Sequence, residues 1–440
     1  MIVLNKREMI CENLSRTAWG ELCLGGVPLG ALAKKYGTPL YLYDEDRIRE
    51  RCRTYIGAVR EAFGERGRVL YASKAASFRR LYEIIGEEGM GIDVVSVGEI
   101  YAARAAGFPL ANAYFHSNNK TDADIEYALD EGVGHFVVDN SEELLAIEEI
   151  AKQRDMRADV LLRITPGIDP HTYAAVATGK VDSKFGSAIE TGQARDITAL
   201  ALSLPHIELS GFHCHVGSQV FDSEVYLRAA EVMLDFIKAM EDELGYTARE
   251  FDIGGGYGVR YVESQPTIDI RENILLVGSY MKRRAEELGI ELPVISFEPG
   301  RSIVADAGLT LYTVGTVKRI PGYKTYVSVD GGMADNPRYA LYGSPYTILT
   351  VNGEIPEDFE CVSVVGRCCE SGDILAENIP MPKDTRRGDL LACLTTGAYH
   401  YSMASNYNRL GKPPIVMLKG GTDYLAVRRE TPEDLLACDV

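Results

Sequence analysis

The residues of this chain that are best suited to chemistry follow short apolar segments. Lys74 comes directly after the run at 69–72, which is typical of a buried strand. A lysine amine that attacks a carbonyl must spend time deprotonated, and a partly desolvated position promotes this. Lys74 is therefore the candidate reactive group, and the alternative is that it only begins a helix.

Further polar residues lie at or near the ends of later apolar runs. These are Asp93, His116, Arg163, His213, His215, Gly254-Gly255-Gly256 and Glu298-Pro299-Gly300-Arg301. The glycines leave backbone N–H groups accessible to a phosphate, which Arg301 would complement. A buried Glu298 requires a partner such as a protonated pyridine nitrogen. With Lys74 for the aldehyde, these groups predict a pyridoxal phosphate site.

A metal hydrolase is the competing interpretation of the same region. His213 and His215 alternate along one strand, and paired histidines are frequent zinc ligands. The alternative for His213 is a hydrogen-bonded core residue. Such hydrolases need additional ligands, however, and the chain has only seven histidines. Because the cofactor accounts for more residues than a metal does, we predict no metal. A catalytically silent protein that kept the fold is a third possibility.

The elements that would position these residues form a repeating pattern. Apolar runs alternate with amphipathic stretches, and this indicates parallel β/α units. Thr121 with Asp124, and Asn140 with Glu143, are typical helix starts. The eight runs are 69–72, 92–96, 113–116, 135–138, 159–164, 209–214, 250–253 and 294–297. Eight such units predict a (β/α)8 barrel of the TIM type, with an open doubly wound sheet as the alternative.

The pattern changes after about residue 305, where short β-rich runs are separated by glycine, proline and charged turns. These runs are 313–318, 325–329, 361–365, 390–394, 415–418 and 424–427. They predict a second domain with a β-barrel or β-sandwich fold. We therefore expect a barrel over 36–305 and a β domain formed by 1–35 and 306–440.

Composition excludes several classes of partner. The net charge of −18 disfavours nucleic acid and anionic membranes, which require clustered Lys and Arg. Nine cysteines without a C-x-x-C pair fit reduced thiols. The chain has neither a transmembrane run nor the order of charges and apolar residues of a signal peptide. We expect a cytoplasmic protein.

Several motifs in this order resemble the fold-type III pyridoxal phosphate decarboxylases. The similarity extends nearly from end to end. The matching motifs are Tyr71-Ala72-Ser73-Lys74-Ala75, the segment 211–219, Glu298-Pro299-Gly300-Arg301, Asn336-Pro337-Arg338, Ala340-Leu341-Tyr342, Cys369-Glu370-Ser371-Gly372-Asp373, Gly397-Ala398-Tyr399 and Ser405-Asn406-Tyr407-Asn408.

The resemblance implies a role for each matching residue. Lys74 would carry the cofactor, His215 would stack on its ring, and Glu298 would hold the ring nitrogen protonated. Cys369 would be the acid that protonates the carbon after CO2 leaves, from the second subunit of a homodimer with shared sites. The remaining cofactor residues would be Asp93, Ser218, Gly254, Gly255, Gly256, Pro299, Gly300, Arg301 and Tyr399, and the substrate residues Arg301, Arg338, Tyr342, Glu370 and Tyr399.

The implied reaction is decarboxylation of meso-2,6-diaminopimelate to L-lysine, the last step of lysine biosynthesis. Arg338 would bind the distal carboxylate and Glu370 the distal ammonium. Without its motif, Arg338 would be interpreted as part of a surface ion pair. Decarboxylation of ornithine, arginine or carboxynorspermidine is the alternative within the class. The chain departs from the family pattern at Ala76, Ser117, His400 and Ala404, and Cys368 beside Cys369 leaves the reactive thiol open.

Overall fold

The computed structural model describes residues 10–168, 182–352 and 358–440. Parts of the predicted 1–35 and 306–440 segments, namely 1–9 and 353–357, lie outside the described residues. The chain forms two compact units. The barrel unit comprises Arg51–Gly258 and Thr267–Ser302, and the β unit comprises Met1–Glu50, Val259–Pro266 and Ile303–Val440.

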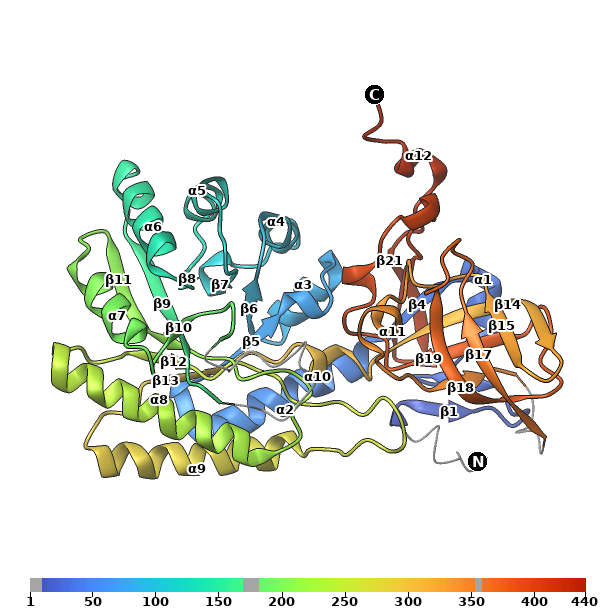
Figure 1. The fold of residues 1–440 in the computed structure, drawn as a ribbon, viewed down its shortest axis with the longest axis horizontal. Coiled ribbons are helices and arrows are strands. Elements are labelled where there is room, and N and C mark those ends of the chain that lie inside the picture. The colour runs from blue at the N-terminus through green and yellow to red at the C-terminus, as the bar shows by residue number, and fades with distance from the viewer. Residues whose placement is uncertain (1–9, 169–181, 353–357) are drawn as a thin grey trace. The chain divides into compact units, whose positions relative to one another are not determined.

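The barrel unit contains a closed ring of eight parallel strands (Figure 1). They are β5 (Gly67–Ala72), β6 (Gly91–Val94), β7 (Ala113–Phe115), β8 (His135–Val138), β9 (Ala158–Thr165), β11 (Ile207–His213), β12 (Glu250–Asp252) and β13 (Val294–Phe297). Pairing of β13 with β5 and of β8 with β9 closes the ring. All eight predicted strands are confirmed, and closure excludes the open doubly wound sheet.

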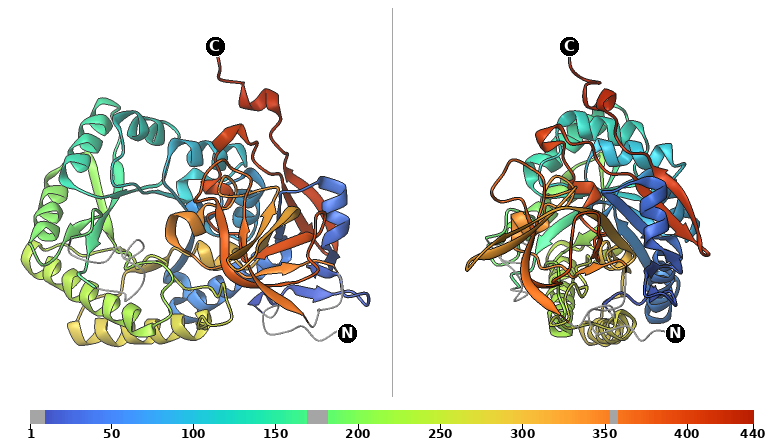
Figure 2. Two further views of the ribbon diagram at one scale, coloured as in Figure 1. Left: turned by 45° about the vertical axis from the view of Figure 1, so that its right-hand side comes forward. Right: turned by 90° about the vertical axis from the view of Figure 1, so that its right-hand side faces the viewer.

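Helices form the outer layer of the barrel unit (Figure 2). They include α3 (Arg79–Glu87), α4 (Val97–Ala105), α5 (Asp122–Asp130), α6 (Ser141–Gln153), α7 (Gln193–Ser203), α8 (Ser223–Leu244) and α9 (Ile270–Leu288). The predicted helix starts are confirmed. Thr121 and Asp124 form a reciprocal capping box, and the Asn140 side chain accepts a hydrogen bond from the Glu143 N–H.

The β unit is organised around the long strand β14 (Gly308–Ile320), which is antiparallel to three others. Leu309 and Leu311 pack into one apolar cluster, whereas Tyr312 and Val314 pack into another. The sheet also contains β4 (Leu40–Asp44), β15 (Lys324–Val329), β16 (Ile348–Thr350), β17 (Phe359–Val365), β18 (Ile374–Pro382), β19 (Leu390–Leu394), β20 (Ile415–Lys419) and β21 (Thr422–Val427). This confirms the predicted change to β structure.

The division of the chain differs from the sequence-based boundary at residue 36. Strand β4 pairs with β14 and β20 and therefore belongs to the β unit. The amino-terminal segment adds β1 (Leu14–Arg16), β2 (Leu22–Leu24), β3 (Val27–Pro28) and α1 (Leu29–Tyr36). Sequence analysis missed β4, β16 and β18. Strand β16 has only three residues and β18 contains two prolines, whereas the apolar and aromatic run of β4 is a strand signal that was overlooked.

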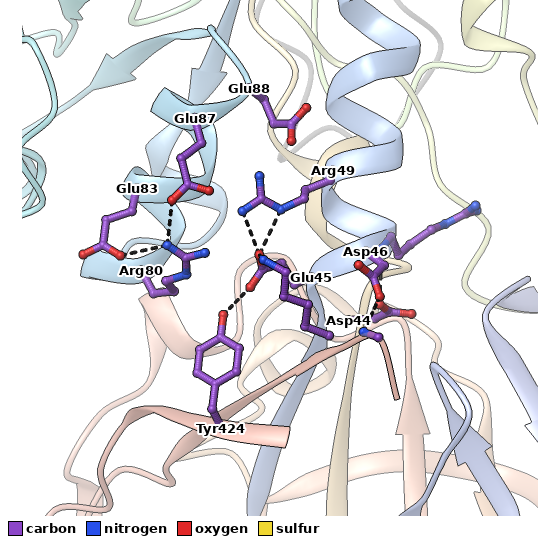
Figure 3. Close-up of polar contacts among 12 residues, drawn as sticks. Asp44, Glu45, Asp46, Arg49, Arg80, Glu83, Glu87, Glu88 and Tyr424 are labelled. Carbon is purple, nitrogen blue, oxygen red and sulfur yellow. Dashed lines mark hydrogen bonds and ion pairs between the residues drawn. The ribbon is translucent and has the colours of Figure 1, made fainter. Parts of the chain in front are cut away.

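A buried carboxylate holds the start of α2 (Glu45–Phe63) within the β unit. Glu45 accepts hydrogen bonds from Arg49 at 2.9 and 2.7 Å, from Lys419 at 2.8 Å, and from the hydroxyl of Tyr424 (Figure 3). These contacts join the helix to β20 and β21, so a charge that would be costly to bury alone is compensated. In the described part of the chain, no helix has the length and hydropathy that a bilayer crossing needs.

Candidate active site

The candidate reactive lysine lies just beyond the end of β5. Lys74 belongs to the single helical turn Ser73–Ala75, and its Nζ lies 3.5 Å from Oδ2 of Asp93 at the end of β6. Asp93 is fully buried, and its other carboxylate oxygen has no hydrogen-bond partner among the described residues. An unsatisfied buried acceptor beside an amine is a suitable environment for a polar cofactor atom.

Glu298 lies between two histidines from strands that are not adjacent in the barrel, since His116 follows β7 and His213 ends β11. Its Oε1 is 2.6 Å from Nε2 of His116, and its Oε2 is 3.0 Å from Nε2 of His213. Burial acts to raise the pKa of Glu298, but the two imidazoles outweigh it and hold that pKa well below its usual value. Burial lowers the pKa of His213 to about 4, so this ring is neutral at pH 7 and donates its Nε2–H. Glu298 is therefore an anion.

The half-buried guanidinium of Arg163 adds positive charge to the same region. Burial lowers the pKa of Arg163, while the charges of Asp139, Glu298 and Asp93 oppose the shift. An arginine keeps its proton even so. The donor atoms of His116, His213 and Glu298 lie within 4.8 Å of one another, a grouping that suits a metal ion. His215 is not among these donors, and a metal cation at this site would be repelled by Arg163.

His215 has the properties of a neutral ring. Burial, followed by the charges of Lys74 and Arg163, holds its pKa well below the usual value. Its Nδ1 accepts a hydrogen bond from the Gly255 N–H at 3.4 Å, so the ring proton is on Nε2. A neutral imidazole can stack on a cationic pyridine ring without charge repulsion.

The glycines after β12 form a turn that admits no side chains. Gly254 and Gly256 have φ values of +76° and +101°. A Cβ on Gly255 would lie 2.0 Å from the Glu298 carbonyl oxygen, and one on Gly256 would lie 2.0 Å from that of Gly217. The Gly254 N–H donates to Oδ1 of Asp252 at 2.7 Å and the Gly255 N–H donates to His215, so the glycine turn would offer a phosphate its remaining backbone N–H groups.

The segment after β13 provides the remaining residues of the predicted phosphate-binding site. The guanidinium of Arg301 donates to Oγ of Ser218 from Nε at 3.3 Å and from Nη2 at 3.0 Å. A Cβ on Gly300 would lie 2.8 Å from Cβ of Ala72, and the Pro299 carbonyl accepts the Ala72 N–H at 3.1 Å. The barrel unit thus supplies an amine, an anionic carboxylate, a neutral ring and a phosphate turn, and this set fits pyridoxal phosphate.

In the β unit, Arg338 is buried among aromatic residues. Only 7% of it is exposed, and its Nε donates to the Tyr346 hydroxyl at 3.0 Å. The guanidinium carbon lies 5.1 Å from the ring centre of Tyr342 and 5.2 Å from that of Tyr399. The alternative of a surface ion pair is therefore wrong for Arg338.

The two adjacent cysteines have different environments. Burial raises the pKa of Cys368 to about 11, and the charge of Asp373 adds to the shift. Cys369 is exposed, and its N–H donates to Oδ1 of Asn408 at 2.7 Å. Glu370 is also exposed and accepts the Gly372 N–H at 3.2 Å. Because its side chain is exposed, Cys369 is more available to a substrate than Cys368.

Sequence analysis assigned no role to His116 and Arg163, and it considered His213 as a zinc ligand or as a hydrogen-bonded core residue. The hydrogen bond with Glu298 fits the second interpretation of His213, but spacing along the chain does not reveal that His116 has the same partner. A further residue, Glu99 in α4, was missed entirely. It interacts electrostatically with Asp93 and Lys74, and its only sequence signal is its place three residues after Ser96 at a helix start.

Comparison with known proteins agrees with this site. Residues 45–305 match the pyridoxal binding domain of the pyridoxal-dependent decarboxylases. The chain is 44% identical to diaminopimelate decarboxylase of Bacillus subtilis, over 96% of this chain and 95% of that protein. The structure superposes on the M. jannaschii diaminopimelate decarboxylase bound to L-lysine with a TM-score of 0.91 and 32% identity, covering 98% of both chains.

A second solved structure gives the same result. The Helicobacter pylori diaminopimelate decarboxylase bound to L-lysine has a TM-score of 0.84 and 32% identity, covering 93% of this chain and 98% of that one. The fold and the site thus define a pyridoxal phosphate-dependent decarboxylase of fold type III. Within that class, the chain belongs to the diaminopimelate decarboxylase family.

Proposed function

We propose that this protein decarboxylates meso-2,6-diaminopimelate, forming L-lysine and CO2 as the last step of lysine biosynthesis. The observation that carries the reaction type is the anionic Glu298 between His116 and His213. When bound, pyridoxal phosphate supplies the electron sink for the electrons that CO2 leaves behind. An anionic carboxylate favours a protonated ring nitrogen, and this makes that sink effective.

We assign the barrel residues to the cofactor. Lys74 attaches to its aldehyde carbon, with Asp93 beside that bond and His215 against the ring face. Ser218, Gly254, Gly255, Gly256, Pro299, Gly300 and Arg301 surround the phosphate, and Tyr399 contributes its hydroxyl. Support comes from the unsatisfied Asp93 oxygen and from a glycine turn in which Cβ atoms would collide with backbone.

We assign the β-unit residues to substrate selection. Arg338 binds the distal carboxylate, and Tyr342 contacts the same end of the substrate. Glu370 accepts a hydrogen bond from the distal ammonium. Arg301 and Tyr399 also reach the substrate. Arg338 is a buried cation with no carboxylate within ion-pair distance among the described residues. A buried charge of this kind is costly until an anion binds, so the site favours a substrate with a second carboxylate.

Cys369 is proposed as the acid that delivers a proton to the carbon from which CO2 has left. Its exposure allows the thiol to reach a substrate, and the raised pKa of Cys368 makes that neighbour less suitable. We further propose a cytoplasmic homodimer in which Cys369 and Lys74 of one site come from different subunits.

The test is CO2 release by the purified protein loaded with pyridoxal phosphate. Diaminopimelate should be converted to lysine, whereas ornithine, lysine, arginine and carboxynorspermidine should be turned over at least about 100-fold less efficiently, as expected for loss of a charged pair. Arg338→Met should remove this preference. Faster turnover of another amine would overturn the substrate assignment, and no turnover of any of the five would overturn the reaction.

A further inference from the structure

Two segments of the β unit carry the residues assigned to the substrate and to the cofactor phosphate. One contains Asn336 and leads into α11 (Arg338–Tyr342), and the other contains Ala398 and Tyr399. Tyr399 has a φ of +64°, a backbone conformation that residues with side chains adopt rarely. The geometry of the segment around Tyr399 must therefore be maintained by contacts beyond the local chain.

His400 joins these two segments through its ring. It is 0% exposed, its Nδ1 lies 3.0 Å from the Ala398 carbonyl oxygen, and its Nε2 lies 2.9 Å from Oδ1 of Asn336. The Ala398 carbonyl oxygen and Oδ1 of Asn336 can both only accept, so each ring nitrogen donates to its partner when it carries a proton. The two ring nitrogens thus face one acceptor in each segment.

The same ring supports the residue that orients Arg338. The edge of His400 packs on Tyr346 with ring centres 5.0 Å apart and planes at 84°. Tyr346 is held on another side by Tyr261, at 5.1 Å and 81°. The Tyr346 hydroxyl accepts the Nε–H of Arg338 at 3.0 Å, and this is the only hydrogen bond of the Arg338 side chain within the described residues.

We propose that His400 is a positioning residue for Arg338 and thereby for recognition of the distal carboxylate. It fixes Asn336, two residues before Arg338, and the ring of Tyr346, which occupies the Nε of Arg338. The two Nη groups are then left to bind a carboxylate in the bidentate manner. This inference rests on the proposed function, because it assumes that Arg338 binds substrate.

Two variants test the link from opposite ends. His400→Phe keeps an aromatic ring and removes both polar contacts of the imidazole, and Tyr346→Phe removes only the hydroxyl that holds Arg338. Each should raise KM for diaminopimelate about tenfold, corresponding to about 1.4 kcal/mol, with kcat within about twofold of the wild type. The visible absorbance of the bound cofactor should not change. If Tyr346→Phe leaves KM unchanged, the proposal is overturned even where His400→Phe does not fold.

A double-mutant cycle separates positioning from general destabilisation. If His400 acts through Arg338, His400→Phe should add little to the KM of Arg338→Lys, and additive effects on KM would contradict the proposal. Val416→Ala is the control, since Val416 is buried in the other apolar cluster of the β unit. It should lower the melting temperature without changing KM, and an equal rise in KM there would also refute positioning.

Failure of the proposed function gives a different result. If Arg338→Lys has wild-type KM for diaminopimelate, Arg338 does not bind the substrate and the substrate assignment fails. If Arg338→Lys raises KM but His400→Phe and Tyr346→Phe do not, only the positioning role is lost.

Discussion

The charge of Glu298 depends on the protonation of its neighbours. A buried carboxylate would ordinarily take up a proton. Here a neutral His213 and the nearby His116 each present Nε2 to one oxygen, and the charge of Arg163 acts on the same carboxylate. The site therefore holds a fixed negative charge before any cofactor binds, which is the preorganisation that electrostatic catalysis requires.

Glu99 should make stability depend on pH near neutrality. Burial raises its pKa from 4.5 to about 7, and the charge of Asp93 adds to the shift. The folded state therefore favours the protonated form. The resulting stabilisation is complete below pH 4.5 and is lost as the pH rises through about 7.

The matching experiment compares Glu99→Gln with the wild type in urea denaturation at several pH values from 5 to 8. Glutamine keeps an acceptor for the Val95 N–H, which Glu99 binds at 2.7 Å. The free energy of unfolding of Glu99→Gln should exceed that of the wild type by an amount that grows with pH. This difference should reach up to about 3 kcal/mol and level off above pH 7. Parallel profiles would show that Glu99 does not titrate in this range.

Ser117 should be a strained position. Its φ is +140°, in the region that favours glycine. Ser117→Gly should therefore raise the free energy of unfolding by about 1 kcal/mol, despite the greater freedom of glycine in the unfolded chain. Ser117→Ala keeps the Cβ and should give no gain in thermal or urea denaturation. If both variants are equally stable, the strain is absent.

At the scale of elements, the turn after β12 is constrained by the start of the segment after β13. Gly255 packs so closely on the Glu298 carbonyl that a methyl group cannot be accommodated without moving one strand end. Because Glu298 and the glycine turn are assigned to opposite ends of the cofactor, a shift here would alter both. The β12–β13 pairing thus sets the distance between them.

Gly255→Ala should release the cofactor and destabilise the protein by about 2–3 kcal/mol, because overpacking forces backbone movement. Cofactor retention after gel filtration and urea denaturation measure the two effects.

Gly57→Ala is the matched control. Gly57 lies exposed inside α2, and a Cβ added there would have no atom within 4 Å, so alanine should stabilise the helix by about 0.5–1 kcal/mol and leave cofactor binding unchanged. Full cofactor retention by Gly255→Ala would refute the tight-turn argument.

At the scale of the whole molecule, shared sites should permit complementation between inactive subunits. Lys74→Ala and Cys369→Ala each disable one side of every site. When the two variants are mixed and allowed to exchange subunits, about half of the dimers are hybrids, and each hybrid has one intact site. The mixture should recover about a quarter of wild-type activity.

Sedimentation velocity on the same mixture shows whether dimers form and exchange. Recovery with exchange supports the shared site, and the separate variants provide the background. Exchange without recovery would place Lys74 and Cys369 of one site in the same subunit. A monomer at all concentrations would refute the homodimer.

Local patterns were sufficient for much of the fold and part of the site. Strands such as 135–138 and 294–297 were located because a short apolar run between helix starts needs no distant partner to be recognised. The capping box at Thr121 is likewise a property of four consecutive residues. The placement of Lys74, Glu298 and the glycines at the ends of parallel strands followed from that pattern, together with the family resemblance.

Long-range packing decided the remainder. His116 and His213 lie far apart in sequence, and only closure of the barrel brings both to Glu298 and leaves that carboxylate charged. In the same way, β4 joined the β unit through pairing with β14, and Arg338 was buried by the rings of Tyr342 and Tyr399. Burial and charge depend on which segments meet in space, and spacing along the chain does not specify that for residues in separate elements.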